Sequence, residues 1–166
     1  MNNKNPAILS VQIIHGSLIM GVFTFLGVIF FLSQNNTPNT EIDISQTEMF
    51  AYISAVMLLI GIAIGQLLFV KMTGTKNNSF TADSADELNP IQLSKYTTAM
   101  IIRDALLEGP TLFSLVTLFL ISGATGTIDT NLLPVQIILS NISVYFFLML
   151  LYFPTEAKIN KAFSEL

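Results

Sequence analysis

A glutamate interrupts an otherwise apolar stretch in the second half of the chain. From Ala105 to Ile121 the sequence reads ALLEGPTLFSLVTLFLI, and Glu108 is the ionisable residue in it. An ionised side chain inside a lipid bilayer costs about 2.5–3.5 kcal/mol or more, so such residues usually face a protein interior and often mark ion pathways. Glu108 is therefore a candidate for binding a proton or a cation.

A second carboxylate lies one helical turn before Glu108. Residues three and four apart share one face of an α-helix, so Asp104, Glu108 and Thr111 are expected to form a polar stripe. Arg103 lies about 140° around the helix from Glu108. Its long side chain is expected to reach the lipid headgroups rather than to pair with Glu108.

The residues that follow Glu108 weaken the backbone of the predicted helix. Pro110 cannot donate a hydrogen bond to the carbonyl of Leu106, and the neighbouring Gly109 has no side chain to fill the gap. In a membrane, a carbonyl without its helical partner must find another one. Gly109 and Pro110 are therefore predicted to distort the helix and to leave a place for a water, a proton or a cation.

Polar residues on two other segments are predicted to lie at the depth of Glu108. His15 belongs to the first apolar segment and Gln66 to the second. Together they predict a buried polar cluster of His15, Gln66, Asp104 and Glu108. An alternative stays open, in which Glu108 is a protonated, hydrogen-bonded residue that serves packing alone, because burial disfavours the charged form.

The segments that must position these residues are strongly apolar. Of the 166 residues 52% are hydrophobic and 11% charged, and the mean hydropathy is +0.65. Soluble domains carry about 25% charged residues, and about 20 apolar residues let a helix span a bilayer. The sequence predicts an all-α, polytopic membrane protein, with one membrane domain over residues 1–166 and helices at about 8–32, 50–70, 95–122 and 132–153.

The first and third segments match one another without a gap, at an offset that pairs Ile13 with Ile101 and Gly21 with Gly109. This internal repeat predicts an ancestral two-helix unit, so that the four transmembrane helices form two helical hairpins in a parallel relation. Gly61 and Gly65 have the spacing of small residues that lets two membrane helices approach closely.

The distribution of basic residues predicts the topology. All seven lysines and arginines lie in the terminal segments or in and beside the loop over residues 73–90, which is rich in Gly, Asn, Ser and Asp. Such a composition is typical of a flexible loop. Because basic residues gather on the cytoplasmic side, the N- and C-termini and this loop are predicted to be cytoplasmic.

Several classes of function are disfavoured. The chain has no cysteine and one histidine, so no metal site is expected. We find no catalytic triad, phosphate-binding loop or pair of haem ligands, and therefore expect neither an enzyme nor a bound cofactor. A net charge of −4 with scattered lysines argues against nucleic acid as a partner.

Two resemblances come with these residues. The string AMIIRDALLEGPTLFSLV, with QIIHGSLIMG before it and YFPTEAKI near the end, resembles a group of small bacterial four-helix membrane proteins with an IIR-x-ALLEGP-x-LF core. That resemblance implies the bacterial inner membrane and brings no function. The shorter string ALLEGPTLFSLVTLFL is similar to the ion-binding helix of the c subunit, the proteolipid of rotary ATP synthases, which implies that Glu108 is an ion carrier.

These observations lead to two functional expectations. The first is a small membrane protein whose Glu108 cluster binds a proton or cation, either as a c-like proteolipid or as a transport component. The second is a non-catalytic accessory subunit of a larger membrane complex. The expected partners are the lipid bilayer and either further copies of the chain or the other subunits of a complex.

Overall fold

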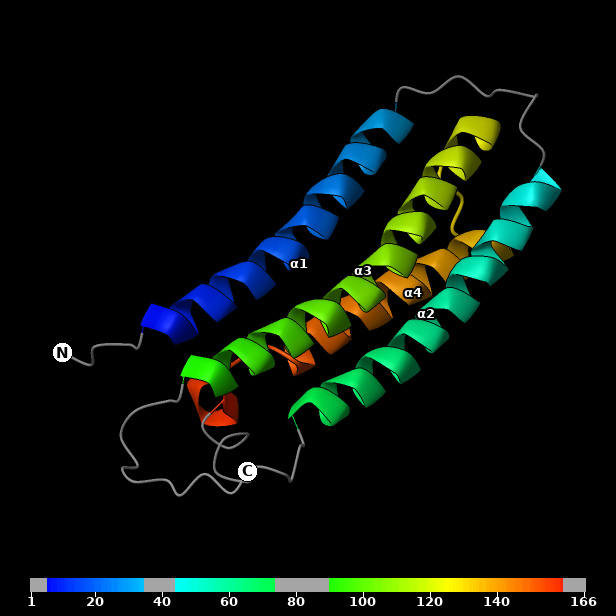
Figure 1. The fold of residues 1–166 in the computed structure, drawn as a ribbon. Coiled ribbons are helices and arrows are strands. Elements are labelled where there is room, and N and C mark those ends of the chain that lie inside the picture. The colour runs from blue at the N-terminus through cyan, green and yellow to red at the C-terminus, as the bar shows by residue number, and fades with distance from the viewer. Residues whose placement is uncertain (1–5, 35–43, 74–89, 160–166) are drawn as a thin grey trace.

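Four long α-helices run alternately up and down (Figure 1). A computed structural model describes residues 6–34, 44–73 and 90–159. The helices are listed in chain order as α1 (Pro6–Ser33), α2 (Ile44–Thr73), α3 (Pro90–Thr125) and α4 (Leu133–Leu151). Each contains a window long and apolar enough to cross a membrane. For the described residues, the prediction of an all-α fold with four membrane-spanning helices is confirmed.

Two helices start earlier than hydropathy indicated. α2 begins at Ile44 rather than near residue 50, because its polar first turns continue the helix and place Thr47 in the buried contact face. α3 begins at Pro90, where a proline needs no helical hydrogen bond. The flexible loop was predicted over residues 73–90; Thr73 and Pro90 belong to α2 and α3, and residues 74–89 lie outside the described residues.

Residues next to the C-terminal ends of α3 and α4 explain why these helices stop there. Gly126 follows α3 with a φ of 76°, a left-handed conformation that favours glycine, and its N–H donates to the Ser122 carbonyl at 2.9 Å. α4 stops at Leu151 rather than at residue 153, because Phe153 precedes Pro154 and a residue before proline avoids helical geometry.

α3 is the central helix of the bundle. Half of its apolar window (50%) is buried, against 17% for α1, 22% for α2 and 39% for α4. In Figure 1 it lies between α1 and α2, with α4 behind, and it packs against all three. α1, in contrast, has little contact with α2. The two hairpins therefore pack differently, and the internal repeat stays a prediction.

α2 contacts its neighbours through a narrow stripe of mostly small side chains. Its buried residues recur every three or four positions, as in a coiled-coil seam. They are Thr47, Ala51, Ser54, Leu58, Gly61 and Gly65. Because four of these six are Ala, Ser or Gly, the backbone of α2 can approach α3 closely.

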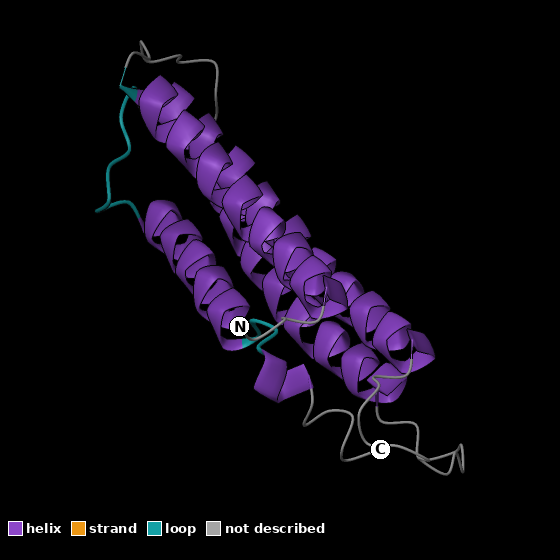
Figure 2. Ribbon diagram, turned by 90° about the vertical axis from the view of Figure 1, so that its left-hand side faces the viewer, coloured by secondary structure: helices purple, strands orange, loops and turns teal. Residues whose placement is uncertain are grey.

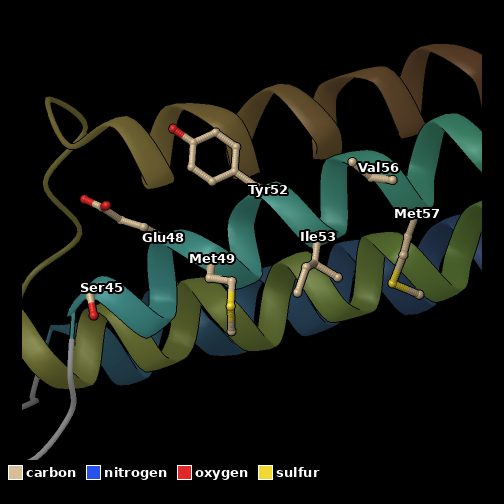
Figure 3. A pocket seen from close by; sticks show the side chains of 7 residues that line it. All are labelled: Ser45, Glu48, Met49, Tyr52, Ile53, Val56 and Met57. Carbon is tan, nitrogen blue, oxygen red and sulfur yellow. The ribbon is translucent and has the colours of Figure 1, made fainter.

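The outward faces of α1 and α2 are apolar and exposed, as a lipid environment requires. A shallow hollow lies on the outer side of α2 near its start (Figure 3). It is lined by Ser45, Glu48, Met49, Tyr52, Ile53, Val56 and Met57. All seven come from this single helix, and the hollow lies at the far end of α2 from the buried charges described next.

Candidate functional site

A buried cluster of charged residues lies where α1, α3 and α4 meet. His15 and Asp104 are fully buried, and Arg103 is 4% exposed. His15 Nδ1 lies 2.6 Å from Asp104 Oδ2, while Arg103 donates from Nε and Nη2 to Asp104 Oδ1 at 3.2 and 3.1 Å. These three residues, termed the charged cluster, join α1 to α3 through ionisable groups.

The partners of His15 fix the number of protons in the charged cluster. His15 Nε2 lies 2.8 Å from the carbonyl oxygen of Met149, which can only accept, so Nε2 carries a hydrogen. The contact between Nδ1 and Asp104 needs one further proton, on either atom. With Arg103 always charged, the charged cluster then has a single net positive charge whichever atom holds that proton.

Aromatic rings surround the guanidinium of Arg103. Its central carbon lies 4.6 Å from the ring centroid of Phe69 and 4.1 Å from that of Tyr152, so both rings interact favourably with the cation. A side chain at Gly65 would bring its Cβ within 3.2 Å of Arg103 Cγ. Arg103 is buried rather than directed to the headgroups, so that expectation is wrong, because a carboxylate and two rings replace its hydration.

The end of α4 closes over the charged cluster. Each of its last four carbonyls has a partner. The pairs are Leu148 with Tyr152 N–H (2.8 Å), Met149 with His15 Nε2 (2.8 Å), Leu150 with Phe153 N–H (3.3 Å) and Leu151 with Lys158 Nζ (2.5 Å). His15 thus caps a helix C-terminus, where a positive group is favoured.

The segment after α4 adds two contacts with α1. Gln12 Nε2 donates to the Pro154 carbonyl at 3.0 Å. The rings of His15 and Phe153 meet edge to face, with their centroids 5.5 Å apart. The charged cluster is thus covered by residues from α1 and from the segment after α4, which Figure 2 draws as a teal loop followed by a short helical turn.

Glu108 lies one turn from the charged cluster and is half-buried. In the part of the chain that the structure describes, its carboxylate makes no hydrogen bond or ion pair, although Asp104 and Tyr145 are close enough to interact with it electrostatically. The structure therefore brings His15 and Asp104 together and leaves Glu108 beside them.

The other predicted site residues lie elsewhere. Gln66 is exposed on α2, so a buried cluster that includes it is wrong. The contact face of α2 contains Gly65, and the next residue necessarily turns about 100° away from that face. Thr111 is buried, but its hydroxyl donates to the Leu107 carbonyl of its own helix at 2.8 Å.

The carbonyl released by Pro110 is covered by another helix. α3 continues through Pro110. A Cβ built on Gly61 of α2 would collide with the Leu106 carbonyl oxygen and lie 3.8 Å from Pro110 Cγ. The oxygen therefore packs against the Cα of Gly61, a contact that weakly stabilises it. α2 thus lies against the carbonyl where a water or an ion was predicted, whereas a Cβ built on Gly109 meets nothing within 4 Å.

Sequence reasoning missed four contributors to the site: Arg103, the Met149 carbonyl and the aromatic rings of Phe69 and Tyr152. Phe69 and Tyr152 at helix ends are ordinary interfacial residues in a sequence, and a backbone carbonyl gives no signal at all. Among the described residues, no group of three His, Asp or Glu side chains could hold a metal ion. No protein-family model, curated protein or solved structure matches this chain.

Proposed function

We propose that this chain is a small integral membrane protein that binds a proton reversibly in its charged cluster, with Glu108 as a second acidic group one turn further into the bundle. The observation that carries the proposal is the 2.6 Å contact between His15 and Asp104. It requires a proton, because the other ring nitrogen of His15 already donates to Met149.

Release of this proton changes the packing of the helices. Without it, the ring has one hydrogen for two acceptors, so a lone pair of one ring nitrogen would face either the Asp104 carboxylate or the Met149 carbonyl, and this contact is repulsive. His15 must then turn or α1 must move relative to α3, while Arg103 keeps Asp104 paired. Proton binding is in this way coupled to the position of α1, as a transport component requires.

A proton suits the charged cluster better than a metal cation does. Hard cations need several oxygen ligands, and both oxygens of Asp104 are already occupied, Oδ1 by Arg103 and Oδ2 by His15. A metal cation would also be repelled by the net positive charge of the cluster.

The membrane and the orientation are part of the proposal. The first turns of α1 and α3, the last turn of α2 and the last turn of α4 lie at the end of the bundle that holds the charged cluster (Figure 1). Lys71, Lys95 and Lys158 are exposed at that end. Basic residues favour the cytoplasmic side, and the resemblance to small bacterial membrane proteins supports the inner membrane. Proton exchange then occurs with the cytoplasm.

A second candidate function is a non-catalytic accessory subunit of a membrane complex, in which the charged cluster only pins α1 in place. The supporting observation is that every group of the cluster has a partner. A permanent structural link would have the same property, but its proton would never leave.

The two functions separate in one titration. His15 is the one histidine of the chain, so ¹⁵N-histidine labelling of protein purified with a histidine-free tag reports on this side chain alone. If the proton exchanges, the ring signals of His15 should change with pH while the protein stays folded, with uptake of one proton per chain. Unchanged signals in folded protein would instead support the accessory function.

The same preparation reports on partners. A large ring made of this chain alone supports a c-like proteolipid, whereas co-purification with a fixed set of other subunits supports the accessory function. Neither outcome replaces the titration, because both kinds of assembly could contain a site that exchanges protons.

A further inference from the structure

Tyr145 of α4 is a buried polar residue to which the charged cluster gives no role. Its side chain is fully buried, and its hydroxyl has no hydrogen-bond partner among the described residues. A buried hydroxyl without a partner is costly and usually indicates a group that the coordinates do not contain or a second functional state.

Tyr145 and Glu108 lie at the same depth in the bundle, on two antiparallel helices. The charged cluster links Asp104 of α3 to Met149 of α4 through His15. One helical turn further into the bundle, α3 presents Glu108 and α4 presents Tyr145. The two side chains interact electrostatically. An acid without a hydrogen-bond partner and a hydroxyl without one thus lie at the same level.

We propose that Glu108 and Tyr145 form a second proton-binding site, in which the Tyr145 hydroxyl donates a hydrogen bond to ionised Glu108, directly or through one water molecule. When Glu108 takes up a proton, an O–H bond forms on its carboxylate and the resulting acid can donate to the phenol oxygen instead. Tyr145 keeps its own proton in both states.

Charge balance links this site to the charged cluster, and this step rests on the proposed function. With Glu108 ionised and the bridging proton present, Arg103, His15, Asp104 and Glu108 have no net charge together. Moving the bridging proton to Glu108 breaks one bond, from hydrogen to His15 or Asp104, and forms one O–H bond. The sum stays zero, which matters because net charge within a bilayer is costly.

Few other titratable groups of the described helices can act on Glu108. α3 contributes Asp104 and α4 contributes Tyr145. α1 contributes His15, which is bonded to Asp104. On α2, Glu48 and Tyr52 are exposed near the opposite end and Lys71 is exposed near the C-terminus. A pH response of Glu108 is therefore governed mainly by Asp104, His15 and Tyr145.

The test is the pH dependence of Glu108 labelling by a hydrophobic carbodiimide, which modifies protonated carboxyls inside the bilayer. Labelled peptides are identified by mass spectrometry, with Glu108→Gln as the background. In Tyr145→Phe the ionised carboxylate loses a donor, so half-labelling should shift upward by about one to two pH units, the value of one hydrogen bond to a charged group. Tyr52→Phe, on the exposed face of α2, should cause no shift.

A second measurement covers the case in which Tyr145→Phe does not fold. In otherwise unaltered protein with ¹³C-labelled tyrosine, Glu108→Gln should change the ring carbon signal of Tyr145 and leave that of Tyr52 unchanged. An unshifted labelling curve in folded Tyr145→Phe, or an unchanged Tyr145 signal in Glu108→Gln, overturns the pairing.

These outcomes are distinct from failure of the proposed function. If the parent protein is unlabelled at Glu108 at every pH, the second site does not exist, although His15 can still titrate. If His15 does not titrate while Glu108 shows the expected shift in Tyr145→Phe, the second site stands and the proton exchange with the charged cluster is wrong.

Discussion

Two buried polar clusters join the helices, and they differ in chemistry. In the neutral cluster, Asn141 Nδ2 of α4 lies 3.0 Å from the Ser54 hydroxyl of α2 and 3.3 Å from the Ser114 hydroxyl of α3. Amides and hydroxyls keep their protons at every physiological pH. The charged cluster instead contains a bridging proton between His15 and Asp104, which exchanges under the proposed function.

The difference shows what each cluster can do. Interhelical hydrogen bonds between neutral groups in membranes contribute about 0.6 kcal/mol on average and about 1.7 at most, enough to select a helix arrangement. The groups that form these bonds have a single protonation state. Under the proposed function the charged cluster has two protonation states with different packing of α1, so of these two clusters it is the one that can couple the fold to pH.

The largest expected effect tests the charged cluster. Asp104→Leu leaves Arg103 and His15 buried without their acceptor, and breaking a buried ion pair in this way costs about 3–5 kcal/mol. The measurement is the free energy of unfolding in mixed micelles. As a control, Glu48→Leu replaces an exposed carboxylate and should change it by about 0.5 kcal/mol or less. A loss below about 1 kcal/mol for Asp104→Leu contradicts the assignment.

A change on α2 should separate the two clusters. In Gly61→Ala the new Cβ collides with the Leu106 carbonyl and pushes α2 from α3, which we expect to cost about 1–3 kcal/mol. α2 supplies Ser54 to the neutral cluster, whereas it contacts the charged cluster only at Arg103 and makes no hydrogen bond to His15. The ¹⁵N signals of His15 should therefore change less than in Asp104→Leu.

Gly109→Ala is the matched control for this substitution. Nothing lies within 4 Å of its Cβ, and alanine is the better helix former, so stability should be unchanged or rise by about 0.5–1 kcal/mol. Equal losses in both glycine variants would mean that contact with Leu106 does not explain Gly61.

The neutral cluster should respond more weakly and without dependence on pH. Asn141→Leu removes the donor to Ser54 and Ser114, and we expect a loss of about 0.6–1.7 kcal/mol in the free energy of unfolding. Because no ionisable group is involved, the loss should be equal at every pH where the parent protein is folded. A loss that varies with pH would mean that the two clusters are coupled.

The smallest effects concern residues that the sequence placed in the site and the structure does not. Thr111→Val removes a hydroxyl that bonds its own helix, and Gln66→Leu changes an exposed side chain. Both should change stability by about 0.5 kcal/mol or less. A loss of His15 titration in Gln66→Leu would return Gln66 to the cluster.

Hydropathy and periodicity predict the fold well because they record burial in lipid, which acts on whole segments. The four helices follow from runs of apolar residues. Helix ends are predicted less well, since polar residues such as Thr47 continue a helix when its partner buries them. The start of α3 at Pro90 was readable, because proline at this position has a specific local preference.

The site was predicted in part, because a sequence shows which side chains are polar and not which way each helix is turned. Asp104 and His15 were singled out as polar residues in apolar segments, and they do meet. Gln66 has the same signal and faces outward. The sequence also could not show that Arg103 folds back between two rings, since this depends on the packing of α2 and α4 around it.

The contacts of His15 also bear on how the protein is assembled. Asp104 lies 89 residues after His15, and Met149 lies 134 residues after it. Synthesis begins at the N-terminus, so the imidazole of α1 enters the membrane long before either of its partners exists. α1 can reach its final position only once α4 has been inserted, and the first helix to be made is therefore the last to be locked in place. A chain that stops before Met149 leaves Nε2 of His15 without its carbonyl acceptor, even when Asp104 is already in place.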